Sequence, residues 1–145
     1  MRSSILLALF VGLLLTPACS LTVAPVLPAV PPPPDVVAGQ LLFVVPSSYV
    51  ETQGMPSVFK DRRDKLPDLL KRDPERVRQI SSREIVTGMT SQHVIWAFLS
   101  HPTRIVDDGP PGSHIMLWEQ GTPFIRGRYW VRTAQDGTVW SAGRF

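Results

Sequence analysis

The residues of this 145-residue chain that could take part in catalysis or metal binding are few and poorly spaced. His93, His101 and His114 lie eight and thirteen residues apart, and neither interval matches the His-x3-His pair of a helical metal site. Asp107 and Asp108 precede a loop rich in glycine and proline, but no series of calcium ligands follows them. No serine lies in a Gly-x-Ser-x-Gly turn that would expose a nucleophile. The sequence therefore predicts no enzyme, no metal site and no cofactor.

The only cysteine, Cys19, lies where an export signal would be cut. Arg2 supplies a positive charge, and residues 5–15 carry no charged or polar side chain. This is the pattern of a secretory signal peptide, predicted here over residues 1–18. A membrane-spanning helix needs about 20 apolar residues, so this run is short for a permanent anchor. A single cysteine also excludes an internal disulfide and a zinc site built from cysteines.

The sequence LTPACS at residues 15–20 resembles the lipobox of bacterial lipoproteins. In that family the cysteine thiol receives a diacylglyceryl group, the signal is removed before the cysteine, and the new amine is often acylated. The resemblance makes Cys19 the expected site of lipid attachment, and two or three acyl chains would hold the protein stably on a membrane. Ser20, in place of aspartate, favours the outer membrane. The alternative is cleavage by the general signal peptidase, which leaves Cys19 unmodified.

A proline-rich stretch, SLTVAPVLPAVPPPPD at residues 20–35, follows the cysteine. Proline fixes φ and lacks a backbone donor, which excludes a helix or a central strand here. Polyproline II with a rise of ~3.1 Å per residue would span on the order of 50 Å. We expect a stiff spacer after the lipid anchor, within a linker and arm over residues 19–46. The alternative is a ligand for a proline-recognition domain.

Residues 47–84 are expected to form a charged helical segment. One helical stretch is predicted between Pro56 and Pro67, a second up to Arg72, and a third with Asp73 as its N-cap. Basic and acidic side chains alternate and nearly balance, which indicates a solvated surface with exposed ion pairs. The formal charge of the chain is only +3. We therefore expect no nucleic acid among the partners.

Residues 85–94, IVTGMTSQHV, carry the most local information in the chain. Gly88 is able to adopt positive φ and so to end one element. Thr90 is a good N-cap for a following helix over residues 91–100, whose apolar positions form a wide stripe. These signals predict a tight helix–turn–helix joint with a buried second helix. The apolar positions of that helix are Val94, Ile95, Ala97, Phe98 and Leu99.

The C-terminal part of the chain is predicted to form strands. Residues 115–120 and 126–133 are expected to be extended, the second with alternating apolar and polar side chains. Asp136-Gly137 predicts a type I′ hairpin turn, because both central positions of that turn need positive φ. Residues 138–142 would then pair back as the last strand. Upstream, residues 41–45 are expected to be a short strand, an arm laid against the domain, or a partner-binding segment.

The joint and the last hairpin together resemble the SmpA/OmlA, or BamE-like, family of small outer-membrane lipoproteins. The resemblance covers residues 85–142. It implies an α+β fold for residues 85–145, with two short helices packed on a three-stranded antiparallel sheet, as also found in the β-lactamase inhibitor protein. It rests on Ile85, Gly88, Met89, Thr90, Val94, Leu99 and Pro102 of the joint, on Trp118, and on the Asp-Gly-x-Val pattern of Asp136, Gly137, Thr138 and Val139.

One surface of the predicted sheet is a candidate binding site. If the alternation over residues 126–133 holds, Arg126, Arg128, Trp130 and Arg132 share one strand face. Arginine and tryptophan are favoured at interface hot spots, and the same set would suit anionic lipid headgroups. The alternatives are an exposed face without a partner, or a Trp130 covered by the N-terminal arm.

These observations predict a lipid-anchored protein on the periplasmic face of the outer membrane, with a small domain that binds envelope proteins. The resemblance implies an accessory role in outer-membrane biogenesis, with the barrel-assembly machinery as the expected partner. Two alternatives stay open. The first is an unanchored periplasmic binder or enzyme inhibitor. The second is a structural subunit of another envelope complex that docks through residues 41–45.

Overall fold

The computed structural model describes residues 36–109, 111–119 and 128–145. The predicted signal peptide, Cys19, the proline-rich stretch and Arg126 lie outside these residues. Among the described residues, no helix is long and apolar enough to cross a membrane. In chain order the elements are β1 (Leu41–Val44), α1 (Ser47–Gln53), α2 (Pro56–Arg72), α3 (Pro74–Ser81), β2 (Glu84–Val86), α4 (Ser91–Phe98), β3 (Arg104–Asp107), β4 (His114–Glu119), β5 (Arg128–Thr133) and β6 (Val139–Arg144).

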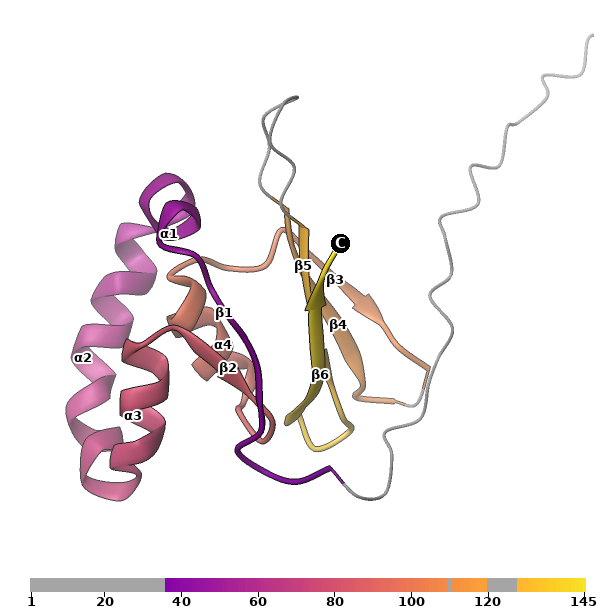
Figure 1. Ribbon diagram of the computed structural model, residues 1–145, viewed down its shortest axis with the longest axis horizontal. Helices are drawn as coiled ribbons and strands as arrows, with labels where there is room; N and C mark the ends of the chain where they lie inside the picture. Colours follow the sequence, from indigo (N-terminus) through magenta and orange to yellow (C-terminus); the bar gives the residue numbers. More distant parts are fainter. Residues whose placement is uncertain (1–35, 110, 120–127) are drawn as a thin grey trace, which may run out of the picture.

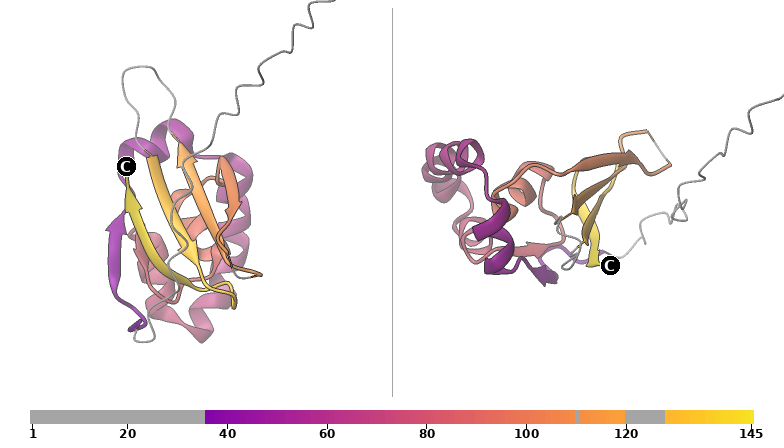
Figure 2. Two further views of the ribbon diagram at one scale, coloured as in Figure 1. Left: turned by 90° about the vertical axis from the view of Figure 1, so that its right-hand side faces the viewer. Right: turned by 90° about the horizontal axis from the view of Figure 1, so that it is seen from above.

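The described part of the chain has the α+β class that the sequence predicts, with more elements than expected. Strands β3, β4, β5 and β6 form an antiparallel sheet in that order, and β1 pairs with β2 in a second, two-stranded sheet. All four described helices lie on one side of the larger sheet (Figures 1 and 2). The larger sheet has four strands where three were predicted, and residues 85–145 contain one helix, α4, where two were predicted. The detailed prediction is therefore wrong in both numbers. It missed β3, whose four residues are all exposed and so lack the alternation that marks a half-buried strand.

The turn between β2 and α4 has the predicted caps but a different first element. Gly88 has φ +83°, as expected. The residues before it form strand β2 rather than a helix, because the buried β-branched side chains of Ile85 and Val86 suit a pleated strand paired with β1. The helix–turn–helix prediction is wrong at this point, and the joint is strand–turn–helix. Leu99 ends α4 in the left-handed region, with φ 53°.

A reciprocal capping box begins α4. The His93 amide donates to Thr90 Oγ1 and the Thr90 amide donates to His93 Nδ1, both over 3.4 Å. Because Nδ1 must accept, the capped helix requires neutral imidazole. The His93 pKa is lowered, first by burial and then by the Arg76 guanidinium, while Asp73 acts in the opposite direction.

The lowered His93 pKa makes the stability of the domain depend on pH. Folding lowers this pKa, so His93 makes its full contribution to the free energy of unfolding at pH values above its pKa in the unfolded chain, about 6.5. That contribution is lost as the pH falls through the lower pKa of the folded domain. We expect His93→Gln, which keeps an acceptor at this capping-box position, to flatten the fall in stability on that acid side. Urea unfolding on both sides of that pH, for the parent and the variant, measures this. Equal acid losses in the two proteins would contradict it.

Helix α2 continues through Pro67, which the sequence analysis took as its limit. A proline inside a helix leaves the carbonyl four residues earlier, that of Arg63, without its donor. Arg63 and Pro67 are both exposed, so water is able to bond that carbonyl. The predicted N-cap of α3 is confirmed, since Asp73 Oδ1 accepts from the Arg76 amide at 2.9 Å.

The core lies between the helices and the larger sheet and joins the two halves of the described chain. Phe98 of α4 stacks on Trp118 of β4, with ring centroids 4.1 Å apart and planes 4° apart. Tyr49 of α1 and Phe43 of β1 contact Phe98 and also Tyr129 of β5. Side chains from the charged helical segment and from the C-terminal strands therefore share a single aromatic cluster.

Backbone hydrogen bonds connect the two sheets. The Gly88 amide donates to the Val139 carbonyl, and the Val139 amide donates to the Met89 carbonyl, both over 2.7 Å. The hairpin before Val139 differs from the predicted type I′ turn, because Gly137 has φ +79° while Asp136 does not have positive φ. The Ala134 amide bonds the Thr138 carbonyl, which leaves a three-residue loop that needs only one left-handed position.

Candidate binding face

The predicted binding residues that the structure describes lie on one face of the larger sheet. Arg128, Trp130 and Arg132 alternate along β5 with Tyr129 and Val131, which point into the core. We call the face turned away from the helices the outer face. It is made by Ile115 and Leu117 of β4, Arg128, Trp130 and Arg132 of β5, Trp140 and Gly143 of β6, and Phe145.

Arg132, a predicted partner-binding residue, is buried. Arg132 is only 8% exposed, and its Nε lies 3.3 Å from Asp108 Oδ2 in a buried ion pair. Its guanidinium carbon also lies 5.4 Å from the Trp130 ring centroid and 5.9 Å from that of Trp140. Arg132 therefore holds two tryptophans and the β3–β4 loop together, and it is not available as a free contact for a partner.

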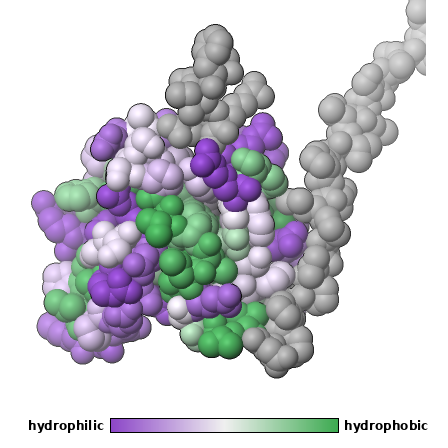
Figure 3. Space-filling view, in the orientation of Figure 1, coloured by the Kyte–Doolittle hydropathy of each residue, from purple (hydrophilic) through white to green (hydrophobic). Residues whose placement is uncertain are grey.

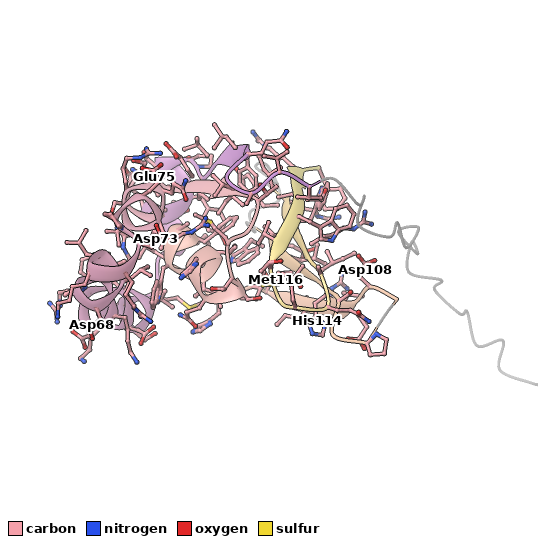
Figure 4. The ribbon with its side chains drawn as sticks, turned by 90° about the horizontal axis from the view of Figure 1, so that it is seen from below. Asp68, Asp73, Glu75, Asp108, His114 and Met116 are labelled. Atoms are coloured by element: carbon pink, nitrogen blue, oxygen red, sulfur yellow. The ribbon has the colours of Figure 1, made fainter. Side chains whose placement is uncertain are left out.

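Figure 4 shows that Asp108 lies at the sheet end of the molecule, whereas Asp73 and Glu75 lie on its helical side. From the sequence, Asp108 is only a weak candidate calcium ligand beside Asp107. The structure places these two neighbours differently, because the Asp108 side chain is 5% exposed and that of Asp107 is 95% exposed. Among the residues that the structure describes, no group of three or more metal-ligating side chains occurs.

Three further members of the outer face were not found from the sequence. Trp140 and Phe145 flank Trp130, with the Phe145 ring centroid 6.5 Å from that of Trp130. The Trp130 indole lies directly on Gly143, where an added Cβ would come within 2.8 Å of the ring. The Gly143 position therefore has to lack a side chain for Trp130 to lie flat. Gly143 lies just beyond the last predicted strand, residues 138–142, and its pairing with Trp130 follows only from the register of β5 against β6.

The outer face is unusually apolar for a sheet with helices on only one side. Met116 and Trp118 of β4 face the core, yet Ile115 and Leu117, which point the other way, are only 3% and 7% exposed. An antiparallel sheet with one covered face commonly alternates apolar and polar residues. The outer face therefore has the composition of a surface that packs against something. Arg128, at its edge, pairs with Glu119 over 3.8 Å, and both side chains are exposed.

A second apolar surface lies on the helical side, at the junction of α1 and α2. It is an open hollow of about 370 Å³, and Phe59 on its rim is 54% exposed. Its lining carries no charged side chain, so it offers van der Waals contact without directional recognition. The lining residues are Val50, Gly54, Met55, Pro56, Phe59 and Leu99.

Comparison with known proteins assigns no relative to this chain. No protein-family model, no curated protein and no solved structure matches it. The resemblance to BamE-like lipoproteins therefore stays a prediction from the motif residues of the β2–α4 joint and the last hairpin.

Proposed function

We propose that the protein is a lipid-anchored protein of the bacterial outer membrane whose small α+β domain binds other envelope proteins. The observation that carries the proposal is the export-signal pattern with the only cysteine of the chain directly after Ala18. An intramolecular disulfide cannot explain a lone cysteine, whereas lipid attachment uses one. The domain would then act on the periplasmic side, as an accessory or scaffold in envelope assembly.

The outer face supports the binding half of the proposal. Trp130 and Trp140 are partly exposed, Phe145 is 57% exposed, and Arg128 stands at the edge of the same face. Aromatic and arginine side chains around a desolvated centre are the usual composition of interface hot spots. The resemblance to the BamE-like family makes a component of the barrel-assembly machinery the first partner to look for.

The structural-subunit alternative has one observation in its favour. Leu41 and Val44 of β1 are 54% and 51% exposed, and apolar surface gathers over β1 in the space-filling view (Figure 3). Strand β1 is nevertheless already paired with β2 and contributes Phe43 to the aromatic cluster. Strand β1 is thus part of the folded domain, and a partner would bind to the edge of a strand that is already formed.

Cys19→Ser tests the anchor. We expect the variant to lose its association with the outer membrane, because its apolar signal alone is short for a permanent span. Membrane fractionation measures this, and mass spectrometry of the mature N-terminus should show a diacylated Cys19 in the parent. Trp130→Ala serves as the control that keeps the anchor. Sedimentation of Cys19→Ser with the outer membrane, or a bare sulfur in the parent, would overturn the anchored proposal.

The binding half has a separate readout in the same cells. A photo-crosslinking side chain at position 128 should yield an adduct with an outer-membrane assembly component. The matched control is position 71 on α2, where Lys71 is 76% exposed. Helix α2 lies on the side of the domain away from the larger sheet (Figure 1). Equal adducts from both positions, or adducts from position 71 alone, would count against the outer face as the binding surface.

A further inference from the structure

We propose that the proline-rich segment of the chain, residues 25–34, docks as a polyproline II helix on the outer face of its own domain. The outer face offers aromatic rings to a ligand, and the chain carries the matching ligand next to it. The docking goes beyond the proposed function, since it concerns how the chain covers its own sheet and needs neither an anchor nor a partner.

The chemistry of the outer face suits proline. Trp140, Trp130 and Phe145 follow one another along β6 and its neighbour β5, and Arg132 fills the space between the two indoles. The result is a row of three aromatic side chains around Arg132, with buried Ile115 and Leu117 beside it on β4. Proline-recognition domains bind polyproline II segments through such aromatic surfaces, because the ligand is already extended and loses little entropy.

The described chain begins at the correct end of this strip. The Thr87 hydroxyl donates to the Val37 carbonyl, and the next amide, that of Gly88, donates to the Val139 carbonyl. Val37 is thus connected through Thr87 and Gly88 to Val139, the residue before Trp140. In Figure 1 the start of the described chain lies below β6, near the β5–β6 hairpin. The described chain therefore starts near the end of β6 that carries Trp140.

The prolines of the segment recur at a regular interval. Pro25, Pro28, Pro31 and Pro34 recur every three residues, which places them on one edge of a helix with 3 residues per turn. At ~3.1 Å per residue, successive members of this stripe are about 9 Å apart.

Along β6, Gly143 with Trp130 above it lies three residues beyond Trp140, and Phe145 lies five residues beyond it. At about 3.4 Å per residue the first interval is at most about 10 Å, because the register shifts next to Trp140, and one turn of the segment is about 9 Å. The Trp130 and Phe145 ring centroids are only 6.5 Å apart. Pro34 would thus meet Trp140, and Pro31 would meet the adjoining rings of Trp130 and Phe145. The segment would run antiparallel to β6.

Docking changes what the proline-rich segment does. A segment laid on the sheet shortens the spacer and covers Trp130. The partner-binding consequence, which rests on the proposed function, is that a partner of the outer face must displace the segment and thereby lengthen the tether.

A spin label tests the docking in the full chain, kept in mild detergent because of its apolar N-terminus. Cys19→Ser removes the native thiol, and Ala29→Cys gives a single labelling position between two stripe prolines. We expect the label to broaden the amide and indole NMR signals of β5 and β6, including the Trp130 Nε1–H, and to leave those of α2 sharp. No broadening on β5 and β6 would overturn the proposal.

Matched proline variants test the register. Serine at positions 25, 28, 31 and 34 should abolish the broadening, whereas Pro32→Ser with Pro33→Ser, off the stripe, should retain it. Equal losses in the two variants would overturn the proposed ring-by-ring contact.

A mixture of spin-labelled chain with isotope-labelled chain that carries no spin label distinguishes docking within one chain from docking between two chains. Broadening in that mixture would mean docking between chains and would overturn the intramolecular proposal. The anchor plays no part in these readouts, so they fail or succeed independently of the lipid.

Discussion

Replacing Trp118 by alanine is expected to lower the free energy of unfolding by about 3–5 kcal/mol, the usual loss for a large aromatic in a core. Trp118 is fully buried, stacks on Phe98, and donates from Nε1 to the Ser100 carbonyl at 3.1 Å. The substitution removes the stacked ring, leaves a cavity between α4 and the sheet, and leaves a buried carbonyl without its donor. Urea unfolding followed by circular dichroism measures the change.

The matched control for Trp118 is Phe59→Ala on α2. Phe59 is also aromatic but is 54% exposed, so its loss should stay within about 0.5 kcal/mol. Trp118→Phe keeps a ring against Phe98 and should recover part of the loss. If Trp118→Ala unfolds at nearly the same urea concentration as the parent, the α4–β4 stack is not the centre of the core.

Asp108→Ala is expected to cost about 3–5 kcal/mol, because it leaves the buried Arg132 guanidinium without its carboxylate. Both side chains are nearly inaccessible to water, at 10% exposure for Arg132 and 5% for Asp108. Water therefore cannot easily replace the lost partner. The neighbouring Asp107→Ala is the control, since its side chain is 95% exposed and should contribute little.

A double variant separates the cost of an unpaired charge from the value of the pair. Asp108→Ala with Arg132→Met removes both charges and keeps apolar contact with the tryptophans, so it should recover most of the stability lost in Asp108→Ala. If the double variant loses as much stability as Asp108→Ala and Arg132→Met lose together when made singly, the ion pair does not couple the β3–β4 loop to β5.

Local signals in the sequence predicted the starts of α3 and α4 correctly. Asp73 and Thr90 act as N-caps as expected, because capping depends on residues only three positions away. Gly88 was placed correctly for the same reason, since positive φ is a property of one residue. The element before Gly88 was wrong because its strand character comes from pairing with β1, some forty residues earlier.

The candidate site was only partly predictable. Alternation along β5 placed Arg128, Trp130 and Arg132 on one face, but it could not distinguish an exposed arginine from a buried one. The burial of Arg132 depends on Asp108 from a distant loop and on Trp140 from the next strand. Such contacts follow from strand register, and register is a property of the assembled sheet. Lipid attachment at Cys19 and the partner-binding role of Arg126 concern residues outside the described chain and stay predictions.

The pairing of β1 with β2 also bears on how this architecture could diversify. Leu41 lies opposite Val86. The segment between these two residues, which contains α1, α2 and α3, therefore has its two ends fixed next to each other, as in a closed loop. Doubling the length of such a loop costs only about 0.6 kcal/mol in closure entropy. The bend between α2 and α3 at Asp73 lies away from the larger sheet (Figure 1). Extra residues there would lengthen a helical finger without shifting the strands, which makes this bend the natural place for insertions among descendants of the chain.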